Sequence, residues 1–463
     1  AMDTNMTKGS AFKLMLIFSI PLLIGNEFQQ FYSMVDTIVV GRFVGINALA
    51  AVGATSGFSF MVIGFAQGLT MGFSVIVSQR YGAGDYENMR KAYAMSIVCS
   101  FITSIVVSVL FALLSMPLLR LIQTPEDIIM DANLYIITIY IGLIAPIYYN
   151  LFSSILRAVG DSKSPLIFLL ISSVLNIVLD LFFVIVVPFG VFGVAFATII
   201  SQIISALLCY FYIVKKYPMF RLTKKEMHID RTLCRRLFAI GLPGALQFSV
   251  CAIGVIIVQA AINGFGSSVV AAYSVGTKIE NVITVIYTVL GMAISTYAGQ
   301  NLGAGNFKRI RHGFNVSFLM MIGATVITIL LAYFITEPMA YLFVDKNTTE
   351  PEVIENCIFY VRTISKFFFF LGLIFVYRTG CQGLGSGAIP MISSITELIA
   401  RAIAAMTLPG MLGYFGVVIA SPIAWMAAGC ILPFCYLYYI GKTEKRFVQH
   451  QRQKIEKTVD MHI

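Results

Sequence analysis

Apolar runs of about 20 residues recur along the whole chain, and no other feature constrains its fold as strongly. Each run is long enough to cross the hydrocarbon core of a bilayer as a helix. Of the 463 residues, 58% are hydrophobic and only 12% are charged, whereas a soluble domain carries about 25% charged residues. The runs also lack the polar face that a helix of a soluble protein turns toward water. We therefore expect an integral membrane protein.

The runs predict twelve membrane-spanning helices and an all-α fold. Few segments alternate between polar and apolar residues, as the strands of a membrane β-barrel would. The first run follows the N-terminal residues directly and is too long for the apolar part of a cleaved signal peptide. The expected helices cover residues 12–41, 48–79, 91–116, 133–157, 164–187, 190–214, 236–263, 268–300, 312–336, 357–382, 390–411 and 415–441.

The loops between these helices sort by charge. Most Lys and Arg residues fall in alternate loops, in 215–236 and in the C-terminal tail, whereas the acidic residues of the other loops gather in 126–131 and 337–355. Short loops rich in Lys and Arg stay in the cytoplasm. We therefore expect both termini on the cytoplasmic side of a prokaryotic plasma membrane. Because these charges set orientation, we do not interpret the net charge of +10 as a sign of nucleic-acid binding.

The eight cysteines and four histidines do not predict a metal centre. The cysteines are scattered without a CxxC pair, and the histidines fall in predicted loops or in the tail. We interpret the cysteines as small apolar side chains of the core. Any metal at the site discussed below would be Na⁺ bound by oxygen atoms.

An internal repeat divides the chain. "SQRYGAGDYENMRKAY" (78–93) matches "GQNLGAGNFKRIRHGF" (299–314), 221 residues further on, and "RAVGDSKSP" (157–165) matches "QGLGSGAIP" (382–390). Six helices per half give both halves the same orientation, as in transporters built from parallel repeats about an axis along the membrane normal. The predicted parts are an N-lobe (1–214), a cytoplasmic linker (215–235), a C-lobe (236–441) and a basic cytoplasmic tail (442–463).

Carboxylates inside the predicted spans need an explanation. An Asp at the centre of a membrane helix costs roughly 2.5–3.5 kcal/mol on insertion scales. Counting about 1.5 Å per residue from the predicted helix ends places Asp36, Asp180 and Thr198 at one depth, roughly 8–12 Å below the outer surface. Asn176 lies one turn from Asp180 on the same helix face. These groups could bind a cation, or the two acids could bind a proton as a pair. They could also be a structural hydrogen-bond network between helices.

Other polar residues in the spans support weaker hypotheses. Glu397 and Arg401 are spaced to pair along one helix, which predicts a self-neutralised structural or gating pair. Glu280, which follows Lys278, is a further candidate for gating in the C-lobe, and the sequence names no partner for it. Pro21 removes one backbone hydrogen bond within the first span and predicts a kink.

Seven motifs are distributed over the two repeats: "MVDTIVVGRFVG" (34–45), "RYGAGD" (80–85), "NLGAGN" (301–306), "RAVGDSKSP" (157–165), "NIVLD" (176–180), "GVFGVAFAT" (190–198) and "ELIAR" (397–401). Taken together, they resemble the multidrug and toxic compound extrusion (MATE) family, in particular its DinF-like branch, over residues 10 to 441.

The resemblance implies two six-helix lobes and the export of organic, often cationic or amphipathic compounds, driven by inward flow of H⁺ or Na⁺ without a cofactor. In the DinF-like branch the cation site lies in the N-lobe. The resemblance implies a cation site formed by Asp36, Asn150, Asn176, Asp180 and Thr198. It also implies a cavity in the N-lobe lined by Gln29, Tyr32 and Gln202. The NorM-like branch uses acids in the C-lobe, but residues 242–259 contain no carboxylate. The sequence does not distinguish H⁺ from Na⁺.

Three alternatives compete with a drug exporter. A flippase for lipid-linked sugars would favour a cationic groove, and few Arg or Lys residues lie in the predicted spans. A membrane-embedded transferase would want a DDxxD motif or a membrane histidine, and neither occurs. A nucleotide-driven pump would need a P-loop, but "GKT" (441–443) lacks its first glycine because position 436 is Tyr. We expect a monomeric transporter and not an enzyme, with the bilayer and small organic molecules as partners.

Overall fold

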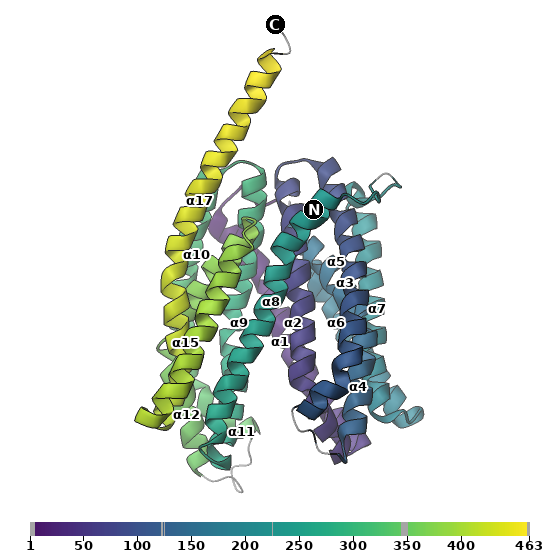
Figure 1. Ribbon diagram of the computed structural model, residues 1–463, viewed down its shortest axis with the longest axis vertical. Coiled ribbons are helices and arrows are strands. Elements are labelled where there is room, and N and C mark those ends of the chain that lie inside the picture. Colours follow the sequence, from purple (N-terminus) through teal and green to yellow (C-terminus); the bar gives the residue numbers. More distant parts are fainter. Residues whose placement is uncertain (1–4, 122–123, 125, 225, 344–350, 461–463) are drawn as a thin grey trace. The chain divides into compact units, whose positions relative to one another are not determined.

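The computed structural model describes residues 5–121, 124, 126–224, 226–343 and 351–460. Within these ranges every regular element is a helix (Figure 1). The elements of the first repeat are α1 (Ala11–Val39), η1 (Val40–Val44), α2 (Ile46–Gly82), α3 (Tyr86–Leu121), α4 (Ile129–Ile141), α5 (Ile144–Ala158), α6 (Lys163–Leu181), η2 (Phe182–Val186) and α7 (Gly190–Lys216).

The second repeat follows η3 (Pro218–Phe220), a short turn in the predicted linker. Its elements are α8 (Arg231–Asn263), α9 (Ser267–Gly303), α10 (Phe307–Phe334), α11 (Thr336–Phe343), α12 (Pro351–Ser365), α13 (Phe368–Leu373), η4 (Ile374–Arg378), α14 (Thr379–Gly383), α15 (Ala388–Leu412), α16 (Tyr414–Val418) and α17 (Ala420–Asp460).

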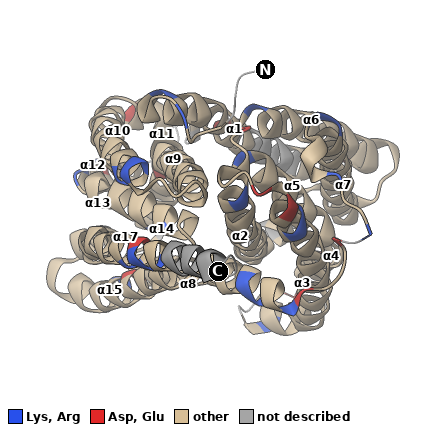
Figure 2. Ribbon diagram, turned by 90° about the horizontal axis from the view of Figure 1, so that it is seen from above, with Lys and Arg blue, Asp and Glu red and all other residues tan. Residues whose placement is uncertain are grey.

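These helices confirm the predicted all-α membrane fold. Ten described helices are long and apolar enough to cross a membrane alone, and the number rises to 12 if each of two bent pairs counts as one span. Seen from above (Figure 2), most of the ribbon carries neither acidic nor basic residues, and Lys and Arg mark the near ends of α2, α5 and α17. The hydrophobic runs of the sequence therefore become the spans.

Two spans are broken, which the sequence analysis did not predict. α4 and α5 meet at 47°, and α12 meets the segment Phe368–Gly383 at 56°. The first break has a local cause, because the ring of Pro146 would collide with the carbonyl of Gly142 in a continuous helix. α17 also differs from the expectation, since it continues as one helix through the predicted tail to Asp460.

By their internal contacts the residues form two compact units that exchange segments. The first unit contains Leu16–Ala252, and the second contains Met6–Met15 and the chain from Ile253 onward. The segment before α1 therefore packs with the second repeat, and the segment before α8 packs with the first. This division does not test the lobe boundaries predicted from the sequence, which stay a prediction.

The N-terminal segment is held by the repeated motif of the second unit. Met6 is buried, and its backbone N–H donates to Gln300 Oε1 at 2.8 Å. Its carbonyl accepts from Asn301 Nδ2 at 3.2 Å and from Arg309 Nη2 at 3.1 Å. Arg309 Nη1 also donates to the carbonyl of Gly9 at 2.9 Å. The motif at 299–314 thus forms a docking site for the start of the chain.

The predicted linker is folded onto the first unit in a corresponding way. Phe220 is fully buried, and its ring lies 5.1 Å from that of Tyr93 on α3. Arg90 Nε donates to Glu226 Oε1 at 3.3 Å. Hydrogen bonds from the hydroxyl and the backbone N–H of Thr223 lower the pKa of Glu226 to about 2, so this carboxylate stays ionised. The motif of the second repeat therefore binds the segment before α1, and the motif of the first repeat, with α3, binds the linker before α8.

Helices α2 and α8 pack closely within the first unit. A Cβ atom added at Gly68 would collide with the backbone of Gly244. A Cβ atom added at Gly72 would lie 2.4 Å from the Cα of Gly241, which is also a steric clash. Small residues allow such close approach of helices in membranes, where van der Waals packing replaces the hydrophobic effect.

Gly68→Ala should therefore destabilise the protein, because the added methyl group meets backbone that cannot move aside. Overpacking of this kind costs about 1–3 kcal/mol. Gly57→Ala is the matched control, since the same helix leaves its position open. Thermal unfolding in detergent should show a lower Tm for Gly68→Ala and an unchanged or higher Tm for Gly57→Ala. Equal Tm values would contradict the close α2–α8 contact.

The loop between α5 and α6 is fixed by a buried carboxylate. Asp161 accepts from the backbone N–H and hydroxyl of Ser164 at 3.0 and 2.8 Å. It also accepts from Lys216 Nζ at 3.0 Å and from the hydroxyl of Tyr217 at 2.9 Å. Burial raises the pKa of Asp161, but the hydrogen bonds from Ser164 and the charge of Lys216 outweigh it, and the pKa lies below its usual value. Asp161 thereby joins the ends of α5, α6 and α7.

Asp161→Asn should lower the Tm at neutral pH, because it removes the charge that binds Lys216. The pKa of Asp161 is depressed in the folded state, so the ionised group stabilises the fold above its unfolded pKa of about 4. This contribution is lost as the pH falls through the lower, folded-state pKa. The Tm difference from the wild type should therefore be constant above about pH 5 and shrink below about pH 4. Asp127→Asn, at an exposed position, is the control, and a difference that does not change with pH would refute the assignment.

Candidate functional site

Helix α6 turns its polar residues inward. Asn176 and Asp180 are 1% and 0% exposed, whereas Val174 and Val178 on the same helix are 57% and 56% exposed. This is the reverse of a soluble amphipathic helix, and it is the arrangement expected where the outer face meets lipid and polar groups face protein. The predicted shared face of Asn176 and Asp180 is therefore observed.

Helix α7 brings further oxygen atoms to this face. Asn176 Nδ2 lies 3.4 Å from Thr198 Oγ1, to which it donates. One turn further along α7, Gln202 Oε1 is buried and has no hydrogen-bond partner within the described residues. Because α6 and α7 are antiparallel, Asp180 and Gln202 lie on opposite sides of the contact between Asn176 and Thr198. The carboxylate of Asp180 and the hydroxyl of Thr198 are oxygen ligands of the type that hard cations prefer.

Asn150 contributes from the broken span. Its side chain is half-buried on α5, and Nδ2 donates to the carbonyl of Pro146 at 2.8 Å. The Asn150 amide therefore bonds back to the first turn of its own helix.

The predicted residues on α1 are only partly described. The side chains of Asp36 and Tyr32 lie outside the described residues, whereas Gln29 is exposed and Pro21 is buried within the continuous helix α1. The predicted kink at Pro21 stays a prediction.

The helices that carry the two acids meet just beyond them. α1 changes to a π-helical turn at Val40 and α6 does so at Phe182. Val40, one turn after Asp36, and Val184, one turn after Asp180, belong to one buried cluster. π-Helical turns within α-helices are frequent at functional sites. The π-helical turns that follow Asp36 and Asp180 therefore lie side by side.

The second unit buries a different charged cluster. Arg401 Nη2 donates to Glu397 Oε1 at 2.6 Å, as the spacing predicted. Arg378 Nη1, at the end of η4, donates to the other oxygen, Oε2, at 3.1 Å and also to Ser394 Oγ at 3.3 Å. All three charged side chains are at most 8% exposed.

The sequence analysis missed Arg378. A single arginine in the apolar run 357–382 was the available signal, because a charge at that position must find a partner inside the protein. Its presence means that Glu397 and Arg401 are not a self-neutralised pair but two members of a cluster with one acid and two bases. Glu280, for which the sequence named no partner, accepts from the hydroxyl of Tyr360 at 2.7 Å.

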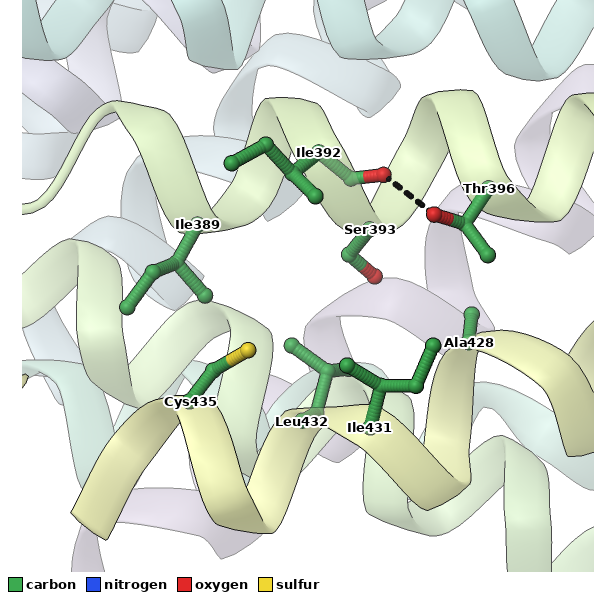
Figure 3. Close-up of a pocket in the computed structure, with 8 residues that line it drawn as sticks. All are labelled: Ile389, Ile392, Ser393, Thr396, Ala428, Ile431, Leu432 and Cys435. Carbon is green, nitrogen blue, oxygen red and sulfur yellow. Dashed lines mark hydrogen bonds between the residues drawn. The ribbon is translucent and has the colours of Figure 1, made fainter. Parts of the chain in front are cut away.

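A small hollow lies near this cluster, between α15 and α17 (Figure 3). Apolar side chains such as Ile389, Ile392 and Leu432 line most of it, and the hydroxyl of Ser393 points into it. It has room for about one water molecule. The hollow is therefore too small to hold an organic substrate.

Up to twelve spans in two sequence repeats, with charged groups buried in each unit, are the architecture of a membrane transporter. The chain matches the MatE family over residues 21–182 and 243–407, one match in each repeat, and it belongs to this family of multidrug and toxic compound extrusion transporters.

Several known proteins are similar over nearly the whole chain. The "Probable multidrug resistance protein YpnP" of Bacillus subtilis is 28% identical over 96% of this chain and 99% of its own length. The "FAD transporter" of Shewanella oneidensis is 25% identical over 90% of this chain and 92% of its own length. The solved structure called "Outward-facing conformation of a multidrug resistance MATE family transporter of the MOP superfamily" has a TM-score of 0.88 and 24% identity, covering 96% and 99% of the two chains. This last likeness confirms the fold.

Glu397→Gln should strongly destabilise the protein, because it leaves two buried guanidinium groups without their shared carboxylate. Breaking a buried ion pair by removing one partner costs about 3–5 kcal/mol. Glu352→Gln, at an exposed position of α12, is the matched control. Thermal unfolding in detergent should show a clear loss of Tm for Glu397→Gln alone, and a wild-type Tm for that variant would contradict the role of Glu397.

Proposed function

We propose that this protein is an antiporter that exports organic, cationic or amphipathic compounds across a prokaryotic plasma membrane in exchange for H⁺ or Na⁺. The observation that carries the proposal is the carboxylate of Asp180, fully buried in a membrane helix beside neutral oxygen donors. Carboxylate, hydroxyl and amide oxygens are the ligand types that hard cations prefer, and a carboxylate favours the binding of a positive ion. The multidrug resistance names of the similar proteins favour export of drugs over the flippase alternative.

In this proposal Asp180 and Asp36 bind the coupling ion, with Asn176, Thr198 and Asn150 around them. Support comes from the meeting of α1 and α6 one turn beyond the two acids. Gln202, Gln29 and Tyr32 would then face the substrate. Residues 242–259 contain no acid that could form the corresponding site in the second repeat, which favours the DinF-like branch and an ion site in the first repeat.

Exchange follows from competition for the same negative charge. When H⁺ or Na⁺ neutralises the two acids, a cationic drug loses its electrostatic attraction and leaves. Ion release restores the charge for the next substrate. Coupling requires that ion and substrate prefer different conformations, because a ligand with equal affinity for both shifts neither. Pro21 leaves α1 with one backbone hydrogen bond fewer, so α1 is the helix that we expect to repack. By the distribution of Lys and Arg, both termini would lie in the cytoplasm.

Ethidium efflux from proteoliposomes tests this function. We expect wild-type efflux to be driven by an imposed gradient of H⁺ or of Na⁺. Asp180→Asn should reduce this efflux at least tenfold, because a neutral amide cannot take up and release the coupling ion as the carboxylate does. Asp127→Asn, at an exposed position, should transport normally.

The gradient that drives wild-type efflux names the ion. Efflux that persists in Asp180→Asn would refute the site in the first unit, and no efflux under either gradient would refute drug antiport.

A further inference from the structure

Three sulfur atoms from distant parts of the chain meet where α8 begins. Met95 and Cys99 lie one turn apart on one face of α3, and each is 1% exposed. Cys234, in the first turn of α8, donates its S–H to Met95 Sδ, with 3.8 Å between the two sulfur atoms. The thiols of Cys234 and Cys99 also interact with each other. The first unit thus gathers two thiols and one thioether in one place.

The first turn of α8 is fixed beside these sulfur atoms. The backbone N–H of Asp230 donates to Met95 Sδ at 3.4 Å. Asp230 Oδ1 in turn accepts from the backbone N–H groups of Thr232 and Leu233 at 2.9 and 3.1 Å, which caps the helix. Met95 therefore lies against a capped helix terminus, and the positions of the sulfur atoms are set by the fold.

The spacing of the sulfur atoms suits a metal ion. Three ligands in a plane around one ion, with metal–sulfur bonds of about 2.3 Å, lie about 4 Å from one another. The sulfur atoms of Cys234 and Met95 are 3.8 Å apart, so an ion can replace the proton between them with little movement. Cys234 is half-buried, and its neighbours Arg235 and Arg236 are exposed. An ion can therefore reach the site from the start of α8.

The ligand types favour a soft monovalent ion. Thiolate and thioether sulfur bind Cu(I), whereas carboxylate, carbonyl and water oxygens suit Mg²⁺ and Ca²⁺. Zinc is bound by Cys, His and carboxylate ligands, and the described part of the chain contains no group of three such side chains that could hold a metal ion. Because the linker before α8 is expected in the cytoplasm, the thiols should stay reduced and available to a metal.

We propose that Met95, Cys99 and Cys234 form a binding site for one soft monovalent metal ion, either Cu(I) or Ag(I). The ion is bound by two thiolates and the thioether, and the two thiol protons are released to solvent. The bound site carries one net negative charge, which the exposed guanidinium groups of Arg235 and Arg236 partly offset. The ion would join α3 to the first turn of α8 and thereby fasten the linker to the first unit.

Competition for Cu(I) tests the site. Cu(I) would be offered to the purified protein in oxygen-free detergent solution, against bathocuproine disulfonate, whose Cu(I) complex is coloured. We expect the wild type to hold one Cu(I) per chain. Cys234→Ser, at a half-buried position, should weaken binding at least tenfold, because it removes one thiolate. Cys430→Ser, which removes an exposed thiol, is the matched control and should bind Cu(I) as the wild type does.

The number of sulfur ligands is measured separately, by X-ray absorption of the copper-loaded protein. We expect three sulfur neighbours around copper in the wild type and two in Met95→Leu. This substitution nearly conserves the volume of the side chain and should preserve the fold. Since a thioether is not a typical zinc ligand, Zn²⁺ should not displace Cu(I) from the wild type.

Two results of the competition would overturn the proposal. One is a wild type that holds no Cu(I) against the competitor, and the other is a wild-type affinity in both Cys234→Ser and Cys99→Ala. A copper spectrum with nitrogen or oxygen neighbours in place of sulfur would also contradict it. Ethidium efflux plays no part in these measurements, so failure of the metal site would leave the proposed exporter function unchanged.

Discussion

The cost of an ionised side chain in hydrocarbon governs how both units of this protein are built. Each such group costs roughly 2.5–3.5 kcal/mol at the centre of a membrane helix on insertion scales, and the two units meet this cost differently. In the first unit Asp180 is buried close to neutral groups, with Asn176 and Thr198 joined beside it. In the second unit, Glu397 forms ion pairs with both Arg378 and Arg401. A carboxylate held between two guanidinium groups cannot exchange a cation without breaking ion pairs.

The two copies of the repeated motif play the same structural role in the two units. Each motif region holds the segment that leads into the other repeat: Arg309 binds the chain at Met6 and Gly9, and Arg90 binds Glu226 in the linker. Such an exchange therefore occurs once in each unit.

The sequence predicted the number and order of the spans because hydrophobic length is read directly from composition. It also predicted the inward face of α6, since Asn176 and Asp180 are one turn apart. The sequence analysis missed the break before α5, because a membrane helix tolerates a proline such as Pro146 when neighbouring groups satisfy the freed carbonyls. It missed the break before Phe368 because no proline marks it. The sequence analysis did not predict the ion pair of Arg378, because its partner Glu397 is 19 residues away. No local sequence pattern links a π-helical turn to a later helix.

The central claim is that the carboxylates of the first unit exchange a cation for the substrate, and ion release on substrate binding tests it most directly. Ethidium would be added to purified protein in weakly buffered solution at the same starting pH for each variant, with released H⁺ measured by a pH indicator and released Na⁺ by preloaded ²²Na⁺. The account predicts that ethidium displaces one of these ions from the wild type and none from Asp180→Asn. Binding of ethidium to the wild type without release of either ion would contradict it.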